Sequence, residues 1–325
     1  MTSSPDAPKL SSAKRMLLEK YLQGSGAHPE TVAAPTSLPT RAATDPDVLR
    51  PAVVAVQTGG SKRPIFYTHI HAEGGAFYCF NLAQTLGPEQ PLYVLEPFRS
   101  TELRTLPSFE AMASAYVASM RAVQPEGPYQ LIGFCGGGLI AFEMAQQLRA
   151  QGQEIDLLVM IEPRAGPDLL RMLRPRLVCG LIDRAGALLR LRPEQRADAF
   201  LALLHAYQFL RVRVLHPAHY QELHAKGMLD LPLIPRAALL HKNWLGIFTW
   251  LTSQYRPRPY PSKLTYLWSR DEPSNRRAGK WGSVTKAKEV EIQRIPGNQN
   301  TCRTEHLCDL AEQLRMCVEQ AQANG

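Results

Sequence analysis

The feature that most constrains the fold is the stretch "YQLIGFCGGGLIAFEMAQQL", residues 129 to 148, in which a β-rich apolar run meets a helical pattern across a glycine-rich turn. A strand that passes directly into a helix is half of a βαβ unit. Five further β-rich runs follow residue 51, namely "PIFYTHI", "PLYVLE", "DLLVMIE", "LTYLWS" and "VEIQRI", with helical patterns at about 75–86, 108–123, 136–151 and 305–320. This order predicts an α/β fold with a mostly parallel, doubly wound sheet.

The alternation breaks between about residues 167 and 260, where the pattern is helical. A helical insertion between two strands of such a sheet is expected to form a lid over the carboxyl ends of the strands. Its aromatic residues are interpreted either as ordinary core, which is favoured, or as the lining of an apolar acyl pocket; they are Phe209, Trp244, Phe248, Trp250 and Tyr255.

The first 50 residues are expected to lie outside the main domain, which we place at 51–325. Residues 1–9 are predicted to be a disordered tail, and 10–24 a short amphipathic helix that begins at Ser11 and ends at Gly24. Residues 25–50 are rich in Pro, Ala, Thr and Ser and are predicted to be a flexible linker.

Composition limits the class of protein. The chain is 45% hydrophobic and 20% charged, without an apolar run long enough for a membrane span and without the apolar core of a signal peptide, so we expect a cytoplasmic protein and no membrane partner. Its six cysteines form no CxxC pair and are expected to be thiols without a metal. The net charge of +8 comes without a nucleic-acid motif. The basic surface is therefore either solvated or suited to an acidic protein or a phosphate-bearing substrate.

The turn itself has the pattern G-x-C-x-G, which is the nucleophile elbow of hydrolases with cysteine at the nucleophile position. At a helix N-terminus, Cys135 is expected to be favoured as a thiolate, and the N–H of Gly136 is expected to face an acyl oxyanion. The alternative is a tightly packed turn, or a phosphate-binding one, in which Cys135 is a small buried residue.

A second motif, "HAEGG", directly follows the first predicted strand. Hydrolases of this type take their other oxyanion donor from that loop, so a backbone N–H at Ala72 or Glu73 is the candidate. His69 and His71 are interpreted as structural rather than catalytic.

With these motifs in place, residues 51 to 320 resemble the thioesterase domains that end nonribosomal peptide and polyketide synthases, which are α/β-hydrolases. The resemblance rests on "RPIFYTHIHAEGGAFYCFNLAQTLGPEQPLYVLEP", on the elbow segment through "DLLVMIEP", and on "IPGNQNTCRTEHLCDLAEQL". It implies that the elbow residue attacks a thioester carried on the phosphopantetheine arm of an acyl or peptidyl carrier protein, with no cofactor of the chain's own. Some members of the family carry cysteine at the elbow.

The resemblance also implies a triad acid and a histidine. Glu162, which closes "DLLVMIE", occupies the position that many megasynthase thioesterases use for the acid and is favoured. Asp271, in "SRDEP", occupies the position that other α/β-hydrolases use. Either one is otherwise a loop carboxylate paired with an arginine.

The histidine is missing, because Gln299 occupies its position in "IPGNQNT". His306 follows in the last predicted helix and is a weak substitute. An amide donates and accepts hydrogen bonds but cannot carry a proton from nucleophile to leaving group near neutral pH. Two hypotheses remain: a thioesterase-like acyl hydrolase or acyltransferase that uses Cys135 and is attenuated in its second step, or a catalytically silent relative that binds a carrier protein or acyl chain.

Overall fold

The computed structural model describes residues 51–70, 77–98, 106–163, 175–215, 243–271 and 285–323. The tail, helix and linker predicted within residues 1–50 lie outside these ranges. So do parts of the predicted lid.

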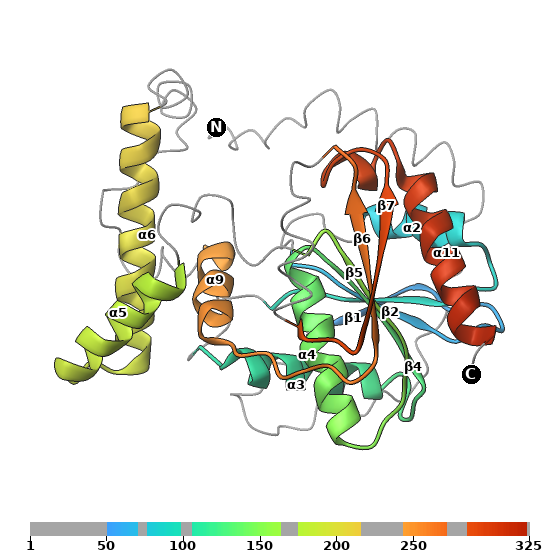
Figure 1. Ribbon diagram of the computed structural model, residues 1–325, viewed down its shortest axis with the longest axis horizontal. Helices are drawn as coiled ribbons and strands as arrows, with labels where there is room; N and C mark the ends of the chain where they lie inside the picture. The colour runs from blue at the N-terminus through green and yellow to red at the C-terminus, as the bar shows by residue number, and fades with distance from the viewer. Residues whose placement is uncertain are drawn as a thin grey trace, which may run out of the picture. The chain divides into compact units, whose positions relative to one another are not determined.

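The centre of the fold is a seven-stranded sheet with the strand order β1-β3-β2-β4-β5-β6-β7 (Figure 1). Every neighbouring pair is parallel except β1 and β3, which are antiparallel. The strands are β1 Val53–Gln57, β2 Ile65–Thr68, β3 Leu92–Leu95, β4 Tyr129–Phe134, β5 Ile155–Ile161, β6 Lys263–Ser269 and β7 Glu289–Ile295. The mostly parallel sheet predicted from the alternation is therefore confirmed.

Burial explains why the central strands read as continuous apolar runs. All six residues of β4 are buried, and β5 is buried at every position except Asp156. Parallel strands covered on both faces require this pattern. The edge strand β1 is partly exposed along its length, and the sequence interpretation missed it.

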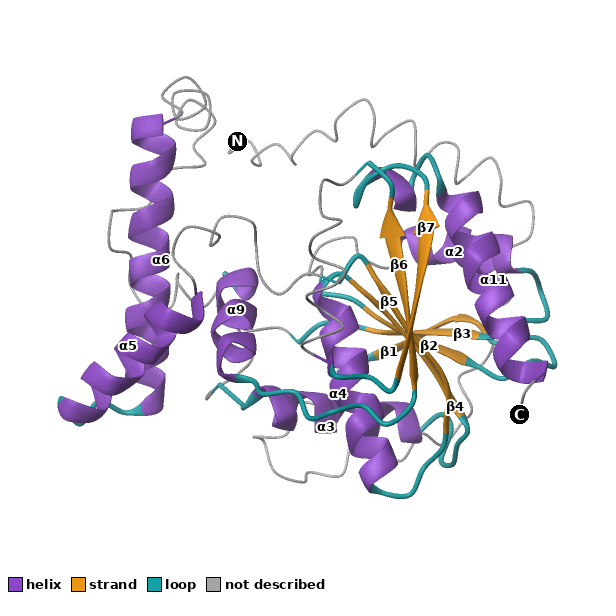
Figure 2. Cartoon of the chain, viewed as in Figure 1, coloured by secondary structure: helices purple, strands orange, loops and turns teal. Residues whose placement is uncertain are grey.

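Helices cover both faces of the sheet (Figure 2). On one face, α4 (Gly136–Ala150) packs on β2, β4 and β5, and α3 (Phe109–Arg121) packs on α4. On the other face, α11 (Leu307–Ala323) contacts β5, β7 and α2 (Phe77–Leu86). The chain is therefore doubly wound, as expected for an α/β-hydrolase fold.

The insertion between β5 and β6 contains the helices α5 (Pro175–Leu188), α6 (Pro193–Leu215) and α9 (Trp244–Gln254). Helix α9 contacts α5 and α6 on one side and α3 on the other. Directly after α9, the Tyr255 hydroxyl donates to Glu143 Oε2 of α4 at 2.5 Å, and Gln146 Nε2 donates to the Arg258 carbonyl at 2.7 Å. These bonds tie the end of the insertion to the helix that begins at the elbow.

None of the helices in the described ranges is long and apolar enough to cross a membrane.

Candidate active site

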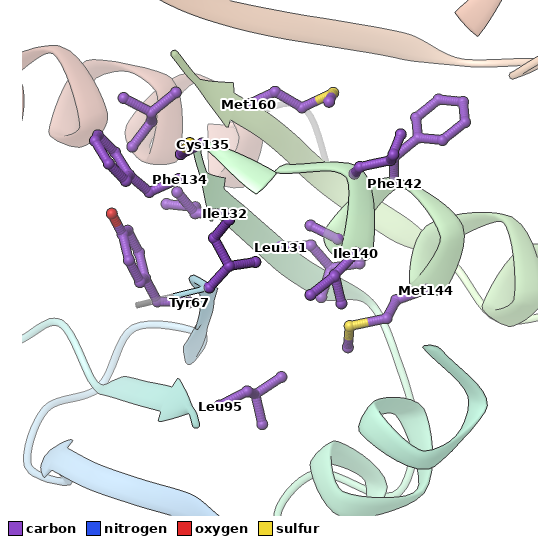
Figure 3. Packing of buried hydrophobic residues seen from close by; sticks show 14 of the residues in the cluster. Tyr67, Leu95, Leu131, Ile132, Phe134, Cys135, Ile140, Phe142, Met144 and Met160 are labelled. Carbon is purple, nitrogen blue, oxygen red and sulfur yellow. The ribbon is translucent and has the colours of Figure 1, made fainter. Parts of the chain in front are cut away.

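Cys135 stands at the tight turn between β4 and α4, among the buried residues around β4 in Figure 3. Its φ of 56° and ψ of −121° are unusual for a residue with a side chain. The turn is held by a hydrogen bond of 2.8 Å from the Cys135 N–H to the carbonyl of Ile161 in β5. Such strain persists only where the surroundings enforce it, and it is concentrated at functional sites. The backbone of Cys135 is thus that of a nucleophile elbow.

Two glycines permit this path. A Cβ at Gly133 would lie 2.4 Å from the carbonyl oxygen of Gly137, and a Cβ at Gly137 would lie 2.2 Å from that of Thr68. The Thr68 hydroxyl also donates to the Gly137 carbonyl at 2.8 Å. The G-x-C-x-G spacing is therefore required by the close approach of backbone segments.

Gln299 lies at Cys135, in the loop between β7 and the short 3₁₀ helix η3 (Thr301–Arg303). Its side-chain amide donates to Cys135 Sγ, with Nε2 and Sγ 3.0 Å apart. The residue predicted from its position in the sequence to replace a histidine thus makes direct contact with the sulfur. A donor at this distance stabilises a thiolate, although it cannot accept the proton of a thiol.

The loop that carries Gln299 is positioned by contacts that do not involve its side chain. Cys302 N–H donates to the Asn298 carbonyl at 2.9 Å, and the Asn298 N–H is bound by the Thr301 hydroxyl oxygen at 2.8 Å. The guanidinium carbon of Arg303 lies 4.5 Å from the ring centroid of Phe134, the residue before Cys135. This cation–π contact joins the Gln299 loop to strand β4. The sequence interpretation did not identify Arg303, and no local pattern marks it.

The two candidate acids differ in their surroundings. Glu162 is fully buried, has a φ of 45°, and its Oε1 accepts hydrogen bonds from the backbone N–H and the hydroxyl of Ser269 at the end of β6. Its own N–H donates to the Leu267 carbonyl at 2.9 Å. Asp271 is exposed, and its backbone N–H donates to Gly297 O at 3.1 Å. Burial and backbone strain favour Glu162, whose partner Ser269 was missed in the sequence because only the fold brings the two together.

In the described part of the chain, His69 and His306 each lie near a carboxylate. His69 is fully buried, with Nε2 3.9 Å from Glu96 Oε1. His306, directly before α11, places Nδ1 3.5 Å from Asp309 Oδ2 and packs its ring against Gly297. His71 and both oxyanion candidates of the preceding loop, Ala72 and Glu73, lie outside the described residues.

Gly136 is the first residue of α4, where backbone N–H groups have no partner within the helix. The N-terminal end of a helix also carries partial positive charge, which favours an anion. The residue after Cys135 thus begins the helix, and the oxyanion role of the Gly136 N–H stays a prediction.

Behind the elbow lies a buried polar pair, in which the Tyr78 hydroxyl donates to the Tyr67 hydroxyl at 2.8 Å. Burial raises the pKa of both phenols well above the usual value, so both are neutral donors. Burial also raises the pKa of the neighbouring Cys79 thiol to about 12.

No group of three His, Cys, Asp or Glu side chains within the described ranges is arranged to hold a metal.

The chain matches known proteins in sequence. A family model described as "Thioesterase domain" matches residues 63–316. A dimodular nonribosomal peptide synthase of Bacillus subtilis is 38% identical over 118 residues, covering 36% of this chain and 5% of that protein. An inactive atromentin synthetase of Paxillus involutus is 26% identical over 266 residues, covering 77% of this chain and 26% of that protein. The chain therefore spans 5% and 26% of the length of these two relatives.

Solved structures agree on the fold. The NocB thioesterase domain in covalent complex with a fluorophosphonate nocardicin G analogue superposes with a TM-score of 0.53 at 23% identity, covering 82% of this chain and 99% of that one. A four-domain nonribosomal peptide synthetase bound to AMP and glycine gives a TM-score of 0.53 at 21% identity, over 81% of this chain and 20% of that one. The family model covers well over half of the sequence, and the chain belongs to the thioesterase-domain family.

Proposed function

We propose that the chain transfers acyl groups from the thioester of a carrier protein of natural-product biosynthesis, with Cys135 as the nucleophile. The observation that carries the proposal is the hydrogen bond of 3.0 Å from Gln299 Nε2 to Cys135 Sγ, at a strained elbow and a helix N-terminus. The hydrogen-bond donor and the helix N-terminus both favour a thiolate over a thiol. Glu162 is proposed as the acid of the site.

In the first half-reaction, the Cys135 thiolate attacks the carbonyl carbon of the thioester, and the N–H of Gly136 binds the resulting oxyanion. The Sγ–C bond forms as the C–S bond to the phosphopantetheine thiol breaks. The leaving group departs as a thiolate and takes a proton from water. Because attacking and leaving sulfurs have similar basicity, this exchange needs no strong general acid. Gln299 as a hydrogen-bond donor is sufficient for it.

The second half-reaction differs, because water must lose a proton as it attacks the acyl-cysteine. Gln299 cannot take that proton near neutral pH, and the loss of a triad member costs about 10⁴ to 10⁶ in rate. The acyl-enzyme is therefore expected to accumulate. Discharge then requires an acceptor that is itself a good nucleophile, such as an amine, which makes transfer more effective than hydrolysis.

The test is intact mass measured after incubation with an acyl thioester of N-acetylcysteamine. Cys308 is exposed and acylates without help, so the measurement uses a Cys308→Ser background. One acyl adduct that disappears in Cys135→Ala is expected. Absence of the adduct would instead support the second hypothesis, a catalytically silent relative that binds a carrier protein or an acyl chain. The observation that favours this second hypothesis is Gln299 at the position where the family resemblance implies a histidine.

Restoring the base tests the second half-reaction. Gln299→His is expected to convert the accumulated acyl-enzyme into steady hydrolysis, raising turnover by at least about 100-fold, the contribution of a general base. If the histidine leaves turnover unchanged, the assignment of Gln299 to the base position is wrong.

A further inference from the structure

Gly136 differs from the other elbow glycines in what excludes a side chain. At Gly133 and Gly137, an added Cβ would meet backbone atoms. At Gly136, it would lie 2.7 Å from Ile70 Cδ1 and 2.7 Å from Phe248 Cε1, and both contacts are with side chains. The chain path therefore does not require glycine at 136. The space that its side chain would fill is occupied by Ile70 and by a ring from the inserted helix α9.

The Phe248 ring is held firmly in that place. It is fully buried, and its centroid lies 6.0 Å from that of Phe109 in α3, with the rings at 72°. Trp244, one turn earlier in α9, places its ring centroid 6.1 Å away. The hydrogen bond between Tyr255 and Glu143 fixes the end of the same helix on α4. The ring is thus packed from two sides on a helix that is anchored to the elbow helix.

The position of the Phe248 ring determines how much space is left for the acyl group in the proposed function, on which this inference rests. When the carbonyl oxygen of a thioester binds the Gly136 N–H and its carbon bonds to Sγ, the carbon next to the carbonyl lies within a few ångströms of Gly136. That carbon then stands beside Phe248 and Ile70. An additional methyl group on it would compete for the space that these two side chains fill.

We propose that Phe248 is a specificity-determining residue, which together with Ile70 selects acyl groups that are unbranched at the carbon next to the thioester carbonyl. A hydrophobic site discriminates one methyl or methylene group by about 10- to 200-fold. The substrate class is therefore straight-chain acyl thioesters rather than α-branched ones.

The experiment compares butanoyl and 2-methylpropanoyl thioesters of N-acetylcysteamine, which have equal carbon counts, by the rate of Cys135 acylation in the Cys308→Ser background. The ratio of the two rates is divided by the same ratio for free cysteine, which removes the intrinsic difference in reactivity. Wild type is expected to favour butanoyl by about tenfold or more. Phe248→Leu is expected to reduce this preference several-fold.

The control is Phe200→Leu, the same substitution at a buried ring that packs on Trp250 of α9, with 5.3 Å between the ring centroids. The atoms nearest to a Cβ at Gly136 belong to Ile70 and Phe248 and not to Phe200. It should leave the preference unchanged. A preference that is absent in wild type, or equal in wild type and Phe248→Leu, overturns the inference. A wild type that is acylated by neither thioester overturns the proposed function itself, and with it the inference.

A second measurement compares the free energies of unfolding of single and double variants, so it requires no catalytic activity. Gly136→Ala is expected to lower the free energy of unfolding in wild type, and to lower it less when Phe248 is already leucine. Additive effects of the two substitutions would show that Phe248 does not fill the space beside Gly136.

Discussion

The hydrogen bond from Gln299 to Cys135 should lower the pKa of the Cys135 thiol. Gln299→Leu removes the hydrogen-bond donor while keeping a side chain of similar size. The loop is held by backbone contacts around Asn298 and Thr301, so its path should survive. A hydrogen bond to a charged group contributes about 1.5–3 kcal/mol, and one pKa unit corresponds to about 1.36 kcal/mol. The pKa of the Cys135 thiol should therefore rise by about one to two units.

The consequence for reactivity has opposite signs at low and high pH. At pH 7 the thiolate fraction falls by about 10- to 100-fold, but a more basic thiolate is more nucleophilic, with a Brønsted coefficient of about 0.4–0.5. The two effects combine to an alkylation rate that is about three- to tenfold slower. At a pH above both pKa values the thiolate is complete in both proteins, and the variant should react about three- to eightfold faster.

The assay is the rate of carbamidomethylation of the Cys135 peptide by iodoacetamide between about pH 6 and pH 10.5, followed by mass spectrometry in the Cys308→Ser background. Following the peptide separates Cys135 from the buried thiols of Cys179 and Cys317, whose pKa burial raises to about 11. Crossing of the two pH profiles is expected. Rates that change by the same factor at every pH would refute the reasoning, because they would indicate altered access to the sulfur rather than altered acidity.

Three further predictions concern the elbow and its supports. Gly137→Ala should lower the free energy of unfolding, measured by urea denaturation, by about 1–3 kcal/mol, because the added methyl group overlaps a backbone carbonyl. The control Gly180→Ala places its methyl group in open space in helix α5 and should raise the free energy of unfolding by about 0.5–1 kcal/mol. Equal effects of the two substitutions would contradict the packing at Gly137. Cys79 should resist iodoacetamide below about pH 9 in the native protein and react after denaturation, because burial raises its pKa to about 12; native labelling at pH 8 would show that it is accessible. Tyr255→Phe should lower the free energy of unfolding by about 1–3 kcal/mol, because Glu143 is left buried with one partner fewer, and Tyr255→Phe combined with Glu143→Leu should recover part of the loss.

Local patterns were sufficient for most of the fold. The central strands β4 and β5 are buried almost throughout, which makes them continuous apolar runs, and the elbow appears as contiguous residues around Cys135. Exposure does not separate the predicted edge strand from the missed one. Strand β7 is partly or fully exposed at every position but one and was predicted, whereas the partly exposed β1 was missed although its sequence is apolar. Gln299 was identified through the family resemblance, which implies a histidine at its position, although its contact with the sulfur follows only from the folding of the loop.

Contacts between distant segments could not be predicted in the same way. Ser269 donates to Glu162 across 107 positions of sequence, and Phe248 lies 112 positions from the glycine it packs against. The sequence identified Phe248 as a core or acyl-pocket aromatic, but nothing in it paired this ring with Gly136, and nothing marked Ser269 as the partner of Glu162. Glu162 was favoured over Asp271 from its position in the sequence, and its burial adds to that preference, whereas Asp271 is exposed.

Cysteine and glutamine at these two positions are chemically consistent with each other. A serine beside Gln299 would have to lose its proton to water, and a hydrogen-bond donor alone cannot lower the pKa of an alcohol into the neutral range. A thiol is already a few per cent ionised at pH 7, so a donor at 3.0 Å shifts an equilibrium that is within reach. The same donor does nothing for a water molecule that must be deprotonated as it attacks. Under the proposed function, an elbow cysteine beside a donor instead of a base therefore separates the two half-reactions. The thiolate can capture the acyl group, and release of that group depends on the nucleophilicity of the acceptor.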